Sequence, residues 1–180
     1  MGFLKTPRYT HPMNLIATAV PFFLLAIAAE WLWGRVSGRD TYRLNDSVSS
    51  LTLGGLSQAR RFVALGIGGS VYAWLMTITP FAPWRLDGWM GWVLAFILYD
   101  LCYYWSHRAG HEIKLFWASH VVHHQSEDYN LSTALRQTST GFLFGWIFYT
   151  PLFFIGVPGE MMVTVGALNL IYQFWVHTEH

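Results

Sequence analysis

The chain has 180 residues, of which 53% are hydrophobic and only 12% charged, and its formal net charge is +1. Soluble domains carry about a quarter of charged residues, so this composition indicates an integral membrane protein. The chain has no basic run, which argues against a nucleic-acid-binding protein, and its single cysteine, Cys102, rules out an internal disulfide and a cysteine-rich metal site.

Apolar stretches along the chain are long enough, or nearly so, to cross the roughly 30 Å hydrocarbon core of a bilayer as helices. Tryptophan and tyrosine residues lie near several of their ends, as expected at a membrane interface. We predict an all-α integral membrane bundle of about four to five transmembrane helices, in a single domain over residues 1–180. In chain order the predicted helices cover residues 13–33, 62–79, 89–105, 142–157 and 161–176.

The connection over residues 35–61 is polar by comparison, and we expect an interfacial segment there, with a short helix capped by Asn45 or Asp46. Most Lys and Arg residues follow the first and third predicted helices. By the positive-inside rule, this side of a multi-pass protein faces the cytoplasm, in a bacterial inner membrane or the endoplasmic reticulum. The region 106–137, which follows the third helix, therefore lies on the cytoplasmic side.

All of the chain's eight histidines except His11 fall into three groups with helical spacing. Such spacing places the rings of each group on one helix face, and the predicted topology brings the groups to one membrane face. Neutral imidazole is the commonest metal ligand, and ligands one turn apart on packed helices are typical of dinuclear sites. Iron, copper, zinc and nickel all suit such a site. The predicted ligands are His107 and His111, then His120, His123 and His124, and finally His177 and His180.

Two carboxylates are candidate catalytic residues. Asp100 lies inside the third apolar stretch, two turns before His107, and could accept a hydrogen bond from a ligating imidazole or simply join two helices. Glu112 follows His111 and could ligate metal, accept a hydrogen bond, or pair with Arg108 or Lys114. The segment between Asn130 and Arg136 could lie across the site.

The histidine motifs carry a resemblance to a known family. HRAGH at 107–111 and HVVHH at 120–124 resemble the HxxxH and HxxHH boxes of the fatty acid hydroxylase/sterol desaturase superfamily, which are membrane-embedded, oxygen-dependent di-iron enzymes. RLNDSVSSLTLGGLSQ at 43–58 and FWVHTEH at 174–180 are similar to its alkylglycerol monooxygenase branch. The resemblance implies two iron ions and O2 as cofactors, and Glu112 occupies a position that is acidic in this branch. It also implies that the iron ligands are His107, His111, His120, His123 and His124, with His177 and His180 in the next histidine element.

The same resemblance implies a lipid substrate taken from the bilayer and a redox partner, with a reduced pterin or a cytochrome b5-like protein as electron donor. The predicted function is therefore that of a di-iron lipid monooxygenase, which in this branch cleaves glyceryl ethers. A desaturase reaction at the same site, and a non-catalytic membrane protein that binds or transports metal, stay open as alternatives.

One departure from the family's pattern affects this prediction. Members carry a final HxxHH box beyond the HTEH element, whereas this sequence stops at His180. We expect a C-terminal truncation before the last histidine box, and a 180-residue polypeptide that is inactive or weakly metallated.

Overall fold

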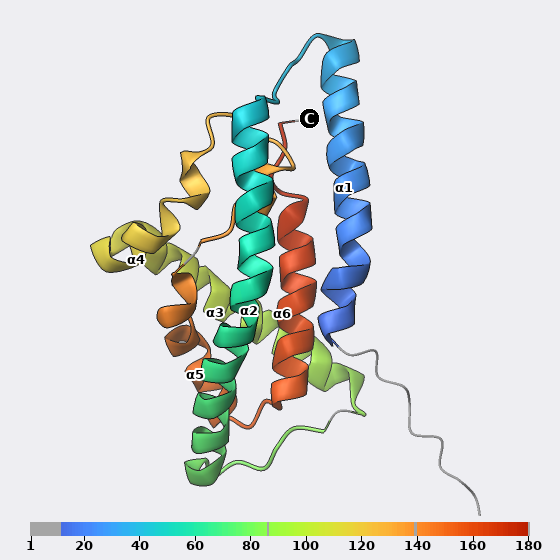
Figure 1. Cartoon of the computed structure of the whole chain (residues 1–180). Coiled ribbons are helices and arrows are strands. Elements are labelled where there is room, and N and C mark those ends of the chain that lie inside the picture. Colours follow the sequence, from blue (N-terminus) through green and yellow to red (C-terminus); the bar gives the residue numbers. More distant parts are fainter. Residues whose placement is uncertain (1–11, 86, 139, 180) are drawn as a thin grey trace, which may run out of the picture.

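The computed structural model of the chain describes residues 12–85, 87–138 and 140–179 (Figure 1). The secondary structure of these residues is helical, as the sequence predicts. The α-helices are α1 (Pro12–Ser37), α2 (Leu44–Ile78), α3 (Trp89–Glu112), α4 (Lys114–His120), α5 (Trp146–Phe154) and α6 (Gly159–Phe174). Short 3-10 turns join them: η1 (His123–Gln125), η2 (Thr133–Leu135) and η3 (Gly141–Leu143).

Helix α2 is much longer than the sequence suggested. A single helix of 35 residues begins at Leu44, where we expected an interfacial connection up to residue 61. The segment contains no proline, and its contacts with α5 and η2 offset the low helix propensity of its glycines. Neither Asn45 nor Asp46 is the N-cap, because that position belongs to Arg43, whereas Asp46 lies in the first turn.

Within the described part of the chain, two helices are long and apolar enough to cross a membrane, over Leu15–Ser37 and Leu44–Ile78. The predicted span 142–157 forms η3 and then α5, whose 9 residues would extend only about 14 Å at roughly 1.5 Å per residue. Glycines at 141 and 145 and the internal Pro151 interrupt a longer helix there. The number of membrane crossings therefore stays a prediction.

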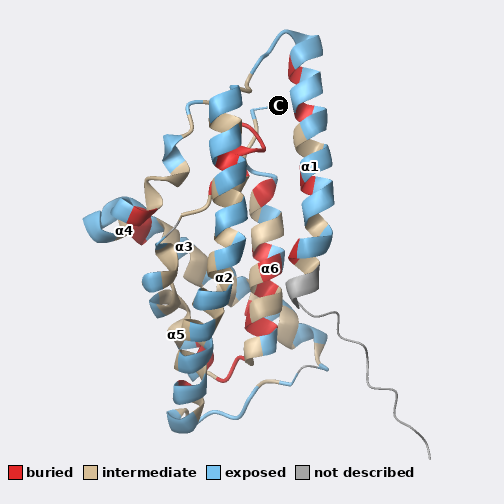
Figure 2. Cartoon of the chain, viewed as in Figure 1, coloured by how far each residue is buried: buried red, intermediate tan, exposed pale blue. Residues whose placement is uncertain are grey.

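Helix α6 occupies the centre of the bundle. It packs against α1 on one side and α3 on another, while α2 packs against α5 and η2 (Figure 1). Buried residues are concentrated on α6, whereas α1 and α2 expose most of their surface (Figure 2). Exposed side chains on these two helices include Phe22, Leu25 and Phe62, and such apolar surface is expected on helices that face lipid.

The end of the bundle opposite the histidines is closed by the turn between α5 and α6. Gly156 adopts a φ of +91°, and a Cβ at this position would lie 2.6 Å from the carbonyl oxygen of Ala82. Trp84 reaches the same turn, since its backbone N–H donates to Gly156 O at 2.9 Å and its Nε1–H donates to Ile155 O at 2.8 Å. These contacts fix where α6 starts, and hence how far its other end reaches towards the histidines.

Candidate metal centre

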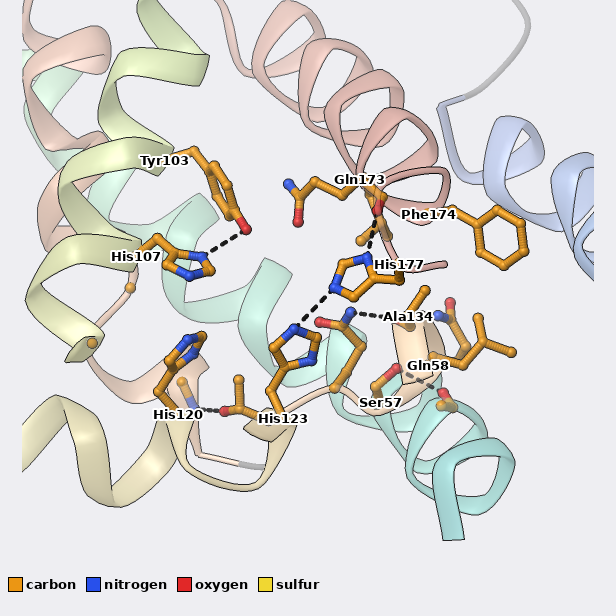
Figure 3. Close-up of a pocket in the computed structure, with 18 of the residues that line it drawn as sticks. Ser57, Gln58, Tyr103, His107, His120, His123, Ala134, Gln173, Phe174 and His177 are labelled. Carbon is orange, nitrogen blue, oxygen red and sulfur yellow. Dashed lines mark hydrogen bonds between the residues drawn. The ribbon is translucent and has the colours of Figure 1, made fainter. Parts of the chain in front are cut away.

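The described histidines from all three sequence groups come together in one cluster (Figure 3). Helix α3 ends with His107 and His111, and α4 and the turn after it provide His120, His123 and His124. His177 follows α6. His180, the remaining predicted ligand, lies outside the described residues.

The first part of the cluster is the four-histidine group, made of His107, His111, His120 and His124. One ring nitrogen from each lies within 4.8 Å of those of the others. The Nε2 atoms of His107 and His111 are 2.9 Å apart, and those of His120 and His124 are 3.1 Å apart. Nitrogen donors that converge from α3, α4 and the turn η1 are the arrangement a metal ion requires.

Gly110 allows α3 and α4 to approach so closely. A Cβ at Gly110 would lie 3.1 Å from Cγ of His120 and 3.3 Å from its Cβ. The imidazole of His120 thus lies against bare backbone within the HRAGH motif. The glycine of this motif is a residue that the sequence reading did not assign to the site.

The second part is the His123–His177 pair, whose Nε2 atoms are 3.0 Å apart. His123 Nδ1 lies 3.1 Å from Arg136 O, and His177 Nδ1 lies 2.7 Å from Gln173 O. A carbonyl oxygen can only accept a hydrogen bond, so each neutral ring carries its hydrogen on Nδ1. The Nε2 lone pairs then face each other, and an ion between them would remove their repulsion.

The two parts are adjacent. The ring of His123 lies 5.2 Å from that of His124 and 5.7 Å from that of His120, measured between centroids. The cluster therefore offers two neighbouring sets of nitrogen donors, which fits two metal ions better than one.

Burial favours the neutral imidazole at five histidines of the cluster, whose pKa values it lowers. Desolvation, followed by the charges of neighbouring histidines, lowers the pKa of His107 to about 4 and that of His120 to about 3. Burial is also the main cause of the lowered pKa values of His123, His124 and His177. A metal ion binds the unprotonated ring, so the cluster is ready to bind metal at neutral pH.

The segment after α4 is anchored by a buried arginine. Arg136 is 5% exposed, and its guanidinium donates to Asp46 Oδ1 at 2.8 Å and to Ser50 Oγ at 3.2 Å. The carbonyl of the same residue orients His123. The carbonyl contact is consistent with the prediction that the segment between Asn130 and Arg136 lies across the site. The guanidinium contacts tie the same segment to α2.

A buried carboxylate on α1 joins three segments, one of which carries His177. Glu30 is 7% exposed, and its Oε2 accepts from the backbone N–H of Leu131 at 2.7 Å and from the hydroxyl of Tyr42. Its Oε1 accepts from the hydroxyl of Thr178, next to His177. Sequence reasoning missed this role, although a lone acidic residue in an apolar helix could have indicated it.

Among the described residues, neither candidate catalytic carboxylate is hydrogen-bonded to a histidine of the cluster. Glu112 Oε1 accepts from Arg108 Nε at 2.9 Å on the exposed face of α3. Asp100 Oδ1 accepts from Asn169 Nδ2 at 2.8 Å. Within the described part of the chain, the imidazole of His107 is instead hydrogen-bonded by Tyr103, whose hydroxyl lies 2.9 Å from Nδ1. Tyr103 lies one turn before His107, which is the pattern that could have revealed it.

An apolar cavity of about 480 Å³ reaches the histidines, and His107, His120, His123 and His177 form part of its wall (Figure 3). Residues of α1, α2, α3, α5 and α6 line this cavity. A second, more polar cavity of about 460 Å³ shares the walls formed by His107, His123 and His177.

Comparison with known proteins agrees with this geometry. The fatty acid hydroxylase family matches residues 92–180, which include every histidine of the cluster. The chain belongs to the fatty acid hydroxylase family.

Among its relatives is the alkylglycerol monooxygenase of Homo sapiens, 38% identical over 92% of this chain. The enzymes of the same name from Danio rerio and Caenorhabditis elegans are 39% and 33% identical over 97% and 92% of this chain. The chain spans 37% of the human relative's length and 38% of the Danio rerio relative's. No solved structure gives a significant match.

Proposed function

We propose that this chain is the histidine-box part of an oxygen-dependent di-iron membrane monooxygenase that acts on a lipid. Glyceryl ethers are the proposed substrate class, because the relatives are named alkylglycerol monooxygenases. The observation that carries the proposal is that the His123–His177 pair lies beside the four-histidine group. Two neighbouring sets of converging ring nitrogens can hold two cations.

An imidazole-rich dinuclear site suits iron, copper, zinc or nickel. Iron is the proposed metal, because it is the usual choice for oxidation of an unactivated C–H bond.

Different parts of the chain have different roles in the proposed enzyme. The imidazoles hold the ions, and the carbonyls of Arg136 and Gln173 fix the orientation of His123 and His177. The apolar cavity excludes water and presents a lipid carbon to the histidine wall. Iron, when bound, supplies the oxygen and one-electron chemistry that such a carbon requires.

The proposed setting is a multi-pass membrane protein whose histidine cluster faces the cytoplasm. The two long apolar helices α1 and α2 support a membrane location. The cluster lies where α3 ends, in keeping with a site at a membrane surface rather than at mid-depth. A reduced pterin or a cytochrome b5-like protein is the proposed electron donor.

The proposal is tested by product analysis. Membranes containing the protein are supplied with an alkylglycerol, O2, iron and a reduced pterin. We expect a fatty aldehyde and free glycerol, which are absent for the His123→Ala variant. A new double bond in the alkyl chain would indicate a desaturase instead. Unchanged lipid together with tight binding of another metal would indicate a non-catalytic metal-binding protein.

A further inference from the structure

We propose that a single hydrocarbon chain enters the apolar cavity sideways from the bilayer, through a slot between α1 and α2. This inference rests on the proposed function, because it assumes that the cavity receives a lipid. It assigns the entrance of the cavity to α1 and α2, which carry none of the histidine motifs.

The slot is defined by two stripes of residues that line the same cavity. On each helix the spacing of three and four residues places the stripe on one face. The α1 stripe consists of Ile16, Val20, Phe23 and Leu24, and the α2 stripe consists of Leu51, Gly54, Gly55 and Gln58.

The slot is open because these two helices pack mainly on other elements. Helix α1 packs against α6, and α2 packs against α5 and η2, so that α6 lies between them (Figure 1). The stacked rings of Phe23 and Phe174, 4.1 Å apart, join α1 to α6 at the back of the slot. Apolar side chains at its edges remain exposed: Val20 by 40%, Leu24 by 47% and Leu51 by 40%.

The surroundings of the slot identify its occupant. Its two walls are the helices that are long and apolar enough to span a membrane, so lipid tails would lie directly outside it. Its lining is apolar apart from Gln58 and Ser57, which suits a hydrocarbon chain rather than a polar cofactor. At the inner end the same cavity reaches His107 and His120, where the proposed chemistry takes place.

Two glycines shape the α2 wall. A Cβ at Gly54 would lie 2.9 Å from the carbonyl oxygen of Leu135, so this glycine is needed for packing against η2. A Cβ at Gly55 would meet nothing within 4 Å, so a side chain there would project into free space and not into the protein. Gly55 therefore widens the slot, and a large residue at this position would narrow it without disturbing the fold.

The experiment compares Gly55→Leu with Gly69→Leu in proteoliposomes. Gly69 lies on the same helix, a Cβ added there would also meet nothing within 4 Å, and the residue does not line the cavity. Each protein is exposed to a single-chain alkylglycerol that carries a photoactivatable diazirine in the chain, and the labelled peptides are identified by mass spectrometry. Bound metal is measured in the same samples.

We expect labelling of the two stripes in the wild type and in Gly69→Leu, and about tenfold less in Gly55→Leu, because overfilling an apolar site weakens binding on that order. Equal labelling of Gly55→Leu and the wild type, or wild-type labelling confined to residues outside the stripes, would overturn the slot. Labelled stripes in a protein that binds no metal would support the slot and count against the proposed function.

Discussion

The Nε2 atoms of His123 and His177 face each other at 3.0 Å, although the two residues come from segments that are 54 positions apart. Both rings are held through Nδ1 by backbone carbonyls, so neither can rotate to relieve the contact without losing a hydrogen bond. The pair is thus preorganised to share a cation.

Replacing His177 by Ala should remove one of two metal-binding steps and leave the other. The four-histidine group does not include His177, so its affinity should change little, whereas the remaining His123 alone should bind far more weakly. Titration of the metal-free protein with Co(II), followed by visible absorption, would resolve the two steps. His11→Ala serves as the control, and loss of both steps or of neither would contradict this assignment.

Gly110→Ala should weaken metal binding although it removes no ligand. The new Cβ would lie 3.1 Å from Cγ of His120 and would push that ring away from His107. Loss of ligand orientation typically costs about 10- to 100-fold in metal affinity. The matched change Gly69→Ala, made in open space on α2, should leave the affinity unchanged. Equal affinities for the two variants would show that the close approach of α3 and α4 is unimportant.

The metal-free protein should lose stability as the pH falls below about 6.5, the usual pKa of a histidine. The unfolded chain then gains protons at imidazoles that the folded chain protonates only near pH 4 for His107 and pH 3 for His120. Because the unfolded state binds more protons in this window, its free energy falls relative to that of the folded state. Thermal unfolding in detergent at pH 7.5, 6 and 5 would measure the loss. A midpoint that stays constant over this range would contradict it.

Glu30→Gln should destabilise the protein by about 1–3 kcal/mol, since an amide offers one acceptor oxygen to three donors and turns its NH2 group towards one of them. Loosening of Thr178 should also weaken metal binding at the neighbouring His177. Glu160→Gln, at an exposed position in the first turn of α6, is the control. Chemical denaturation and metal titration of both variants give the comparison, and equal stabilities would argue against the role of Glu30.

The helical class and the grouping of the histidines could be predicted because both follow from local patterns. Apolar runs predict helices, and spacings of three and four residues place imidazoles on one helix face. The match to the fatty acid hydroxylase family supports the grouping of the histidines, because the matched residues 92–180 include the whole cluster.

Other features depend on contacts between distant segments, which a single sequence does not reveal. The 35-residue length of α2 is an example, because the polar composition of residues 35–61 suggested a connection, whereas the segment from Leu44 packs as a helix against η2 and α5. The ion pair of Arg136 with Asp46 and the hydrogen bonds of Glu30 with Leu131 and Thr178 likewise join residues 90 to 148 positions apart. The partner of Asp100 proved to be Asn169 on α6, which no local pattern indicates.

The central claim is that the histidine cluster holds iron, and metal analysis of the purified protein tests it most directly. Elemental analysis by mass spectrometry and a visible spectrum would be recorded on protein purified from iron-supplemented cells, beside a variant with both His123 and His107 replaced by Ala. We predict iron as the principal metal, no haem absorption band, and loss of the iron in the variant. Protein that carries zinc or copper in place of iron, or iron that the variant retains in full, would contradict the account.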